Sequence, residues 1–152
     1  MNTESAMEGG ATAAATLTIL HEVVRRFNPD APRMDELGMQ ALTKIFKKLH
    51  MEVPDQDQLY LLASASEMAT NSLYYALAGA GSKNNVWLRG ALLGALAGIG
   101  AVVLPGPLGL DGSASSRTPK TKLMTIAWYL VGGIVAAAVT QELDRRQRKR
   151  ER

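Results

Sequence analysis

Apolar side chains near the start of the chain recur at steps of three or four residues, which is the spacing of one face of an amphipathic helix. The segments are residues 13–27, with Leu17, Leu20, Val24 and Phe27 on that face, and residues 33–51, with Leu37, Ala41, Ile45 and Leu49. Prolines follow each segment and end it, because the residue before a proline disfavours helical geometry. Ahead of both, residues 1–12 are mostly small and polar, and they predict a disordered tail.

A third segment, residues 55–80, is longer and more apolar, and Glu67 is its one charged residue beyond the acidic start. Ser, Thr and Asn residues surround Glu67 in the middle of the segment, where a bilayer would be driest. A carboxylate at the bilayer centre costs about 2.5–3.5 kcal/mol. We therefore expect a soluble or interfacial helix here, with a third membrane helix over residues 59–80 as the alternative. Residues 13–82 together then form a cytoplasmic or interfacial region of about three helices.

From residue 86 onward, long apolar stretches replace the amphipathic pattern. Two stretches carry no charged residue, 90–110 and 123–141. The predicted spans are residues 86–104 and 123–140, joined by a connector over residues 105–122. As helices they would be about 28 and 27 Å long, close to the roughly 30 Å of a bilayer core. We predict an all-α integral membrane protein in which residues 86–140 form a transmembrane hairpin. A buried hairpin in a soluble helical bundle is the alternative.

The formal net charge of +3 hides an asymmetry between the two halves of the chain. Residues 1–82 hold six Lys or Arg and ten Asp or Glu. Residues 83–152 hold eleven Lys or Arg and four Asp or Glu. The basic tail, residues 141–152, outweighs the connector in positive charge, so the positive-inside rule predicts that both termini are cytoplasmic. Since no signal peptide is apparent, we expect a bacterial inner membrane. The predicted interface anchors are Trp87, Arg89, Lys122, Arg145, Arg146, Arg148, Lys149 and Arg150.

Small residues recur at helical spacing in both predicted spans. They are Gly90, Gly94 and Gly98 in the first span, and Gly132, Gly133, Ala136 and Ala137 in the second. Steps of four residues place such positions on one helix face, where another backbone can approach closely. The pattern predicts close helix packing. It leaves open whether the partner is the other span of the hairpin, a second copy of the chain, or the neighbours in a pore.

Few residues of this chain are typical of a catalytic or metal site. There is no Cys, no phosphate-binding glycine loop and no nucleophile motif, and His21 and His50 lack the spacing of metal ligands. We therefore expect no cofactor and no metal. The basic tail contains no aromatic residue that could stack on bases, so we expect no nucleic-acid partner. Glu67 and Asn71, four residues apart, are the one candidate polar site, and a lipid-modifying enzyme with Glu67 as acid or base is the enzymatic alternative.

These features predict a non-enzymatic, membrane-anchored interaction or scaffold module. Its partners would be the lipid bilayer and an unidentified protein on the N-terminal helices, and it could form a homo-oligomer through Gly90, Gly94 and Gly98. In outline, residues 86–152 resemble holins, which are small proteins with membrane hairpins and basic tails. That resemblance implies an oligomeric pore or membrane-permeabilising protein as the alternative function, and it assigns no site residues.

Overall fold

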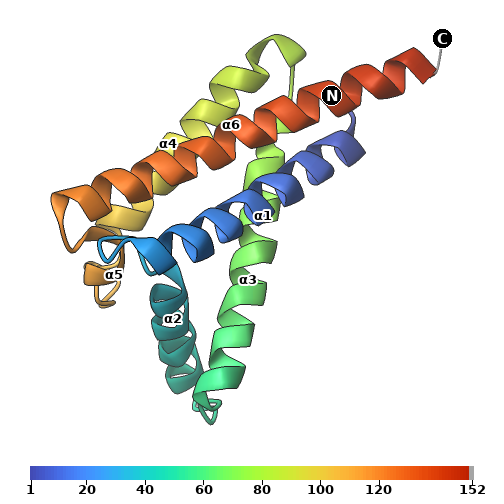
Figure 1. The fold of residues 1–152 in the computed structure, drawn as a ribbon. Helices are drawn as coiled ribbons and strands as arrows, with labels where there is room; N and C mark the ends of the chain where they lie inside the picture. Colours follow the sequence, from blue (N-terminus) through green and yellow to red (C-terminus); the bar gives the residue numbers. More distant parts are fainter. Residues whose placement is uncertain (151–152) are drawn as a thin grey trace.

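Helices make up all the regular secondary structure of residues 1–150, the part of the chain that the computed structural model describes (Figure 1). The α-helices are α1 (Thr3–Phe27), α2 (Met34–Lys48), α3 (Gln56–Ala76), α4 (Val86–Val103), α5 (Ser113–Ser116) and α6 (Pro119–Arg150). Two 3₁₀ turns, η1 (Leu77–Gly79) and η2 (Lys83–Asn85), connect α3 to α4. The predicted all-α class is confirmed. Helix α6 includes most of the predicted tail, whose residues 151 and 152 lie outside the described part.

The longest helix, α6, has 32 residues and lies between α1 and α4 (Figure 1). Helix α1 runs antiparallel to it. At one end the backbone N–H of Asn2 donates to Asp144 Oδ1 at 3.0 Å, and at the other end Asn28 Nδ2 lies 3.8 Å from Met124 Sδ. Helices α1, α6 and α4 therefore form one layer, which we call the α1–α6–α4 layer.

Helix α4 also runs antiparallel to α6, and the predicted glycine stripe forms the contact between them. The residues at this contact are Gly90, Gly94 and Gly98 on α4, and Gly133 and Ala137 on α6. A Cβ added at Gly94 would lie 2.6 Å from the Tyr129 carbonyl oxygen and 2.7 Å from Leu130 Cα. Any side chain larger than hydrogen would therefore force the two backbones apart. Because this face packs within the chain, it is not free for self-association in this structure.

The first helix begins earlier than the sequence suggested. We expected a disordered tail over residues 1–12, but α1 starts at Thr3 and continues without a break. Gly9 lies against α6, where an added Cβ would be 2.9 Å from the Ala136 carbonyl oxygen, and Gly10 lies against α3. The small residues that suggest disorder in the sequence are the ones that let α1 fit between α3 and α6. The sequence reading missed this because a Gly/Ala tract has no apolar periodicity.

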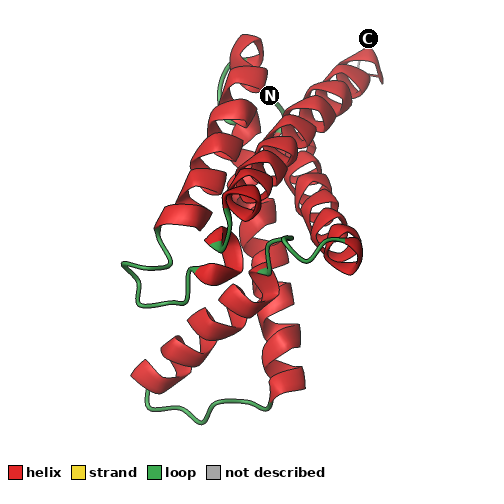
Figure 2. Cartoon of the chain, turned by 60° about the vertical axis from the view of Figure 1, so that its left-hand side comes forward, coloured by secondary structure: helices red, strands yellow, loops and turns green. Residues whose placement is uncertain are grey.

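The N-terminal helices share one core with the hairpin rather than forming a separate region over residues 13–82. The buried core cluster combines α1, α2, η1, α3 and α6, with Ala13, Leu17, Met34, Tyr75, Ala78, Tyr129 and Ala136. Tyr75 Oη donates to the Tyr129 carbonyl oxygen at 2.7 Å and fixes α3 to α6. Helix α2 starts beside the connector, where the Arg33 N–H donates to the Ala114 carbonyl at 2.8 Å. From there, α2 and α3 extend away from the layer (Figure 2).

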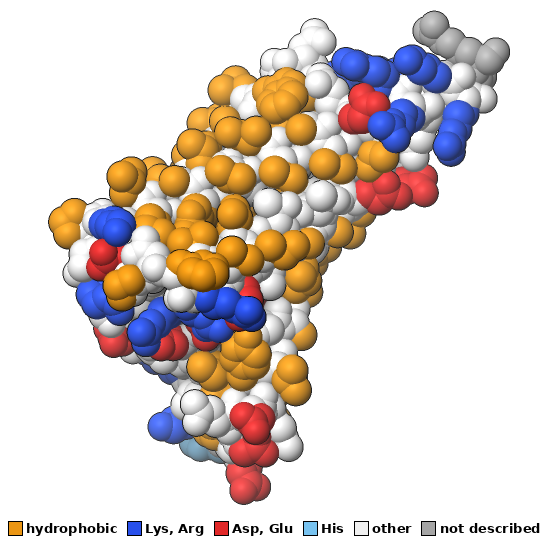
Figure 3. All heavy atoms as spheres, in the orientation of Figure 1, with side chains coloured by type: hydrophobic (Ala, Val, Ile, Leu, Met, Phe, Trp, Pro, Cys, Tyr) orange, Lys and Arg blue, Asp and Glu red, His pale blue; other side chains and the backbone are white. Residues whose placement is uncertain are grey.

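Two helices, Lys83–Val103 and Pro119–Arg150, are long and apolar enough to cross a membrane. Charged side chains gather at both ends of the α1–α6–α4 layer, and apolar side chains cover the length between them (Figure 3). One end carries the basic residues of α6 beyond Glu142. The other end carries the basic residues of the connector, and Lys44 of α2 donates to the Leu108 carbonyl oxygen there. The predicted orientation, with both termini cytoplasmic, stays a prediction, because no membrane is present to give the two ends a side.

The packing of the α4 glycines against α6 predicts that alanine substitutions at two glycines of α4 change stability by different amounts. We expect Gly94→Ala to destabilise the fold by about 1–3 kcal/mol, because the new methyl group overlaps α6. In Gly100→Ala the methyl group would meet only Leu104 Cδ1 at 3.5 Å, so this variant should be neutral or more stable by up to about 1 kcal/mol from helix propensity. Thermal unfolding of both purified variants in detergent, followed by circular dichroism, measures the difference. Equal midpoints would contradict this packing.

Candidate functional site

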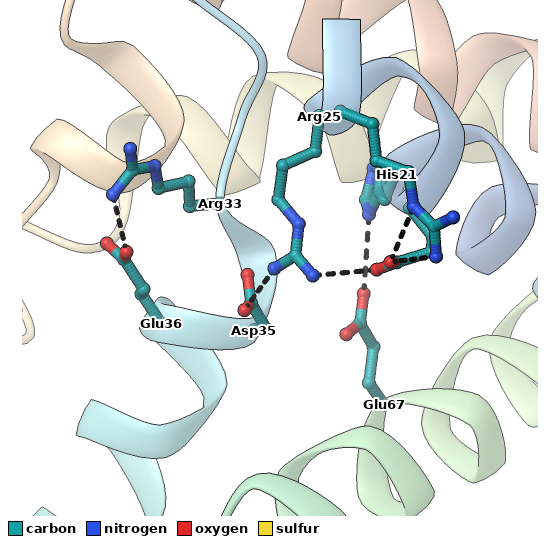
Figure 4. Close-up of polar contacts among 8 residues, drawn as sticks. His21, Arg25, Arg33, Asp35, Glu36 and Glu67 are labelled. Atoms are coloured by element: carbon teal, nitrogen blue, oxygen red, sulfur yellow. Dashed lines mark hydrogen bonds and ion pairs between the residues drawn. The ribbon is translucent and has the colours of Figure 1, made fainter. Parts of the chain in front are cut away.

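The most unusual polar contact in the structure joins His21 of α1 to Glu67 of α3. The His21 Nδ1 and Glu67 Oε1 atoms are 4.0 Å apart, and the side chains are only 12% and 27% exposed (Figure 4). The His21 ring packs against α6, with its centroid 5.0 Å from that of Trp128 and 6.2 Å from that of Tyr129. Three helices therefore meet at this pair, which we call the His21–Glu67 pair.

A network of ion pairs lies next to the pair, at the end of α1. Arg25 forms ion pairs with Glu22 at 2.7 Å and with Asp35 of α2. Arg26 lies 2.9 Å from Glu22, and a separate pair joins Arg33 to Glu36 on α2 (Figure 4). These carboxylates have arginine partners. Within residues 1–150, Glu67 has no Lys or Arg within ion-pair distance, and His21 is its one ion-pair partner.

Burial changes the protonation of both members of the pair. Removal from water raises the pKa of Glu67 from 4.5 to about 6, and the negative charge of Asp35 adds to this rise. Burial lowers the pKa of His21 from 6.5 to about 4, more strongly than Asp35 raises it. At neutral pH the imidazole is therefore uncharged, and Glu67 ionises only slightly below that pH.

The second ring nitrogen of His21, Nε2, is buried and has no hydrogen-bond partner. A proton on Nε2 would be a buried N–H donor without an acceptor, which is costly. A proton on Nδ1 faces the Glu67 carboxyl group, so we assign the proton of the neutral ring to Nδ1. The pair can accept or release one proton at the Glu67 carboxyl group. Over residues 1–150, no three His, Asp or Glu residues are grouped as a metal site.

Glu67 and Asn71 also border an apolar groove between α2, α3 and α4, with a volume of about 570 Å³. We call it the α2–α3–α4 groove. Its walls are mainly small and aliphatic, and include Leu37, Ala41, Ala63, Leu96, Ala97 and Ala101. At one end Tyr74 Oη donates to the Leu93 carbonyl oxygen at 2.9 Å and joins α3 to α4. At the other end Lys44 Nζ donates to the Leu108 carbonyl oxygen and joins α2 to the connector.

The predicted interface anchors lie toward the two ends of α4 and α6, and several have partners within the chain. Trp87 Nε1 donates to Gln141 Oε1 at 3.0 Å, and Arg89 Nε donates to the Ala78 carbonyl oxygen of η1 at 3.0 Å. Arg145, Arg146 and Arg148 form ion pairs with acidic residues one turn earlier on α6, whereas Lys122, Lys149 and Arg150 are simply exposed. Arg89 therefore holds the end of η1 in addition to lying near a span boundary.

Sequence reasoning selected Glu67 and Asn71 as a candidate polar site, and it did not select His21. We predicted both polar residues from their spacing on one helix, and the structure places both beside the groove. His21 gave no signal because its partner lies on another helix and no motif joins the two. The remaining predicted positions, Gly132 and Ala136, lie in the core: Gly132 against Tyr75 and Leu17, and Ala136 within the core cluster.

The raised pKa of Glu67 predicts a pH-dependent effect of Glu67→Gln. A carboxyl group that ionises less readily when folded lowers stability as pH rises from about 4.5, and the full cost is present above about pH 6. The variant should therefore equal the parent near pH 4 and be more stable at pH 7 by about 1 kcal/mol, after allowing for partial exposure.

The lowered pKa of His21 acts in the opposite sense, because stability falls as pH drops from 6.5 toward 4. That loss is present in both proteins and cancels in the comparison. Chemical unfolding of the parent and the variant at several pH values gives the difference curve. A difference that is largest at pH 4 would contradict the environment described for Glu67.

No family model, no curated protein and no solved structure matches this chain.

Proposed function

We propose that this chain is a membrane protein in which α4 and α6 cross the bilayer, and that it acts by binding as a non-enzymatic, membrane-anchored interaction module. The observation that supports this most is the exposure of α4. Of an apolar 18-residue stretch of this helix, only 22% is buried within the chain. Its outward face is leucine-rich, and Leu96 is 63% exposed.

A soluble bundle would normally place its most apolar helix in the core. Here glycines of α4 occupy the contact with α6, and the large apolar side chains point away from the chain. The outward set is Leu88, Leu92, Leu96, Ile99 and Val103. A contiguous apolar surface of this kind is typical of contact with lipid or with another protein.

The charged ends of the layer support a bilayer as the apolar surrounding. The uncharged stretch 123–141 of α6 measures about 28 Å, close to a hydrocarbon thickness of roughly 30 Å. Since α1 lies along α6, a bilayer around α4 and α6 would also contact α1, whose Ile19 and Val23 are exposed. The proposal therefore extends membrane contact to α1, beyond the hairpin that the sequence predicted.

The binding part of the proposal concerns the helices beyond the connector end of the layer. Helices α2 and α3 extend away from the layer there (Figure 2). The far part of this pair carries exposed apolar side chains, including Ile45, Leu49, Met51, Leu61 and Leu62. These could meet a protein partner. We do not extend the proposal to a holin-like pore, because the glycines that would mediate self-association pack against α6.

Single cysteines test the membrane setting directly, because the natural chain has none. We expect Leu96→Cys and Ile134→Cys to resist a membrane-impermeant maleimide in native membranes and to react after detergent is added. Both side chains are exposed in the isolated chain, so protection that detergent removes would come from a surrounding bilayer. Leu49→Cys, at the exposed position directly after α2, is the control that should react once the reagent reaches its side of the membrane. Labelling of Leu96→Cys as fast as in the control would contradict the proposal.

A second pair of cysteines tests whether the hairpin crosses the bilayer. Ser113→Cys and Glu142→Cys are both exposed, and they lie at opposite ends of the layer. If α4 and α6 cross, these two sites should react from opposite faces of sealed vesicles of one orientation. Reaction of both from the same face would mean that the layer lies on the membrane surface.

A further inference from the structure

We propose that the α2–α3–α4 groove holds one acyl chain of an anionic phospholipid, whose headgroup contacts Lys44 and Lys47. This inference rests on the membrane setting proposed above. The groove suits a hydrocarbon chain because small residues, among them Gly38, Ala41 and Ala63, leave space between the helices. Its volume of about 570 Å³ lies within the usual range of small-molecule pockets, roughly 300–1,000 Å³.

The open side of the groove points to a lipid as the occupant. Leu96 of α4, Leu104 directly after α4 and Leu108 of the connector line it, and all three are exposed. Leu96 belongs to the α4 face that the membrane proposal places against lipid. The groove is therefore continuous with the bilayer interior, and an acyl chain could enter it sideways without passing through water.

The groove is closed at the Tyr74 end, which favours an acyl chain over a partner helix as the occupant. The hydrogen bond from Tyr74 to the Leu93 carbonyl joins α3 to α4 there. A helix from a partner or a second copy has a diameter of about 10–12 Å with its side chains, and it could not continue past this contact. A flexible hydrocarbon chain can simply end there.

The connector end of the groove carries the positive charge that an anionic headgroup requires. A second depression of about 620 Å³ adjoins it, and Leu110 lines both. Lys44 and Lys47, three residues apart on α2, line this depression together with Gln40 and Glu36. Glu36 is engaged with Arg33 at 2.8 Å. Lys44 donates to the Leu108 carbonyl oxygen, but its ammonium group has two further N–H donors, so both lysines can attract a phosphate group.

The test is lipid retention by the full chain, purified in detergent and examined by native mass spectrometry. The probes are phosphatidylglycerol and phosphatidylcholine with identical acyl chains. We expect one phosphatidylglycerol per chain, retained at least tenfold better than phosphatidylcholine. Equal retention of the two lipids, or a dimer in place of a lipid adduct, would overturn the inference.

Two variants separate the contribution of the acyl chain from that of the headgroup. Ala41→Trp should fill the groove and reduce retention of both lipids at least tenfold, whereas Ile45→Trp, four residues later on an exposed position, should not. Lys44→Gln combined with Lys47→Gln should remove the preference for phosphatidylglycerol, whereas Lys48→Gln, outside the depression, should keep it. If circular dichroism shows that Ala41→Trp fails to fold, the lysine variants still test whether Lys44 and Lys47 bind the headgroup.

The inference and the membrane proposal fail in different ways. Protection of Leu96→Cys together with no retained lipid in the parent protein would leave the membrane setting intact and remove the acyl-chain site. Free labelling of Leu96→Cys in native membranes would remove the membrane setting itself. Parent-like lipid retention by Ala41→Trp would show that lipid binds elsewhere on the chain.

Discussion

Close approach of backbones on two sides of α6 is the constraint on which the rest of this structure depends. On one side Gly90, Gly94 and Gly98 allow α4 to contact the α6 backbone, and on the other side Gly9 allows α1 to do the same. The gain is van der Waals contact, which does not require the exclusion of water. Packing by small residues also leaves the large apolar side chains of α4 free to point outward, where a bilayer would favour them.

The candidate site follows from this packing. Since α1 is pressed against α6, His21 lies on the rings of Trp128 and Tyr129. Helix α3 is fixed by the hydrogen bond from Tyr75 to Tyr129, and this places Glu67 opposite the imidazole. An acid with a raised pKa and a base with a lowered pKa then face each other without an arginine between them. Their protonation depends on burial more than on charge partners.

The groove has the same origin. Helices α3 and α4 meet at Tyr74 and Leu93. The groove beside this contact is lined by leucines together with alanine and glycine residues, and the small residues leave space between the helices. In water such a space would collapse or bind an apolar ligand. Beside a bilayer, the nearest apolar ligand is the lipid itself, and the lysines of α2 stand where its phosphate would lie.

The sequence by itself determined the helices and the two apolar segments, because periodicity and the absence of charge are local properties. It also identified the small-residue positions and Glu67 with Asn71. Tertiary structure alone decided which surfaces these positions meet. It turned the Gly/Ala tract of residues 1–12 into a packed helix, placed His21 against Glu67 and put the basic residues of α2 beside the connector. Such pairings join residues far apart in the chain, and the spacing of one helix contains no information about the face of another.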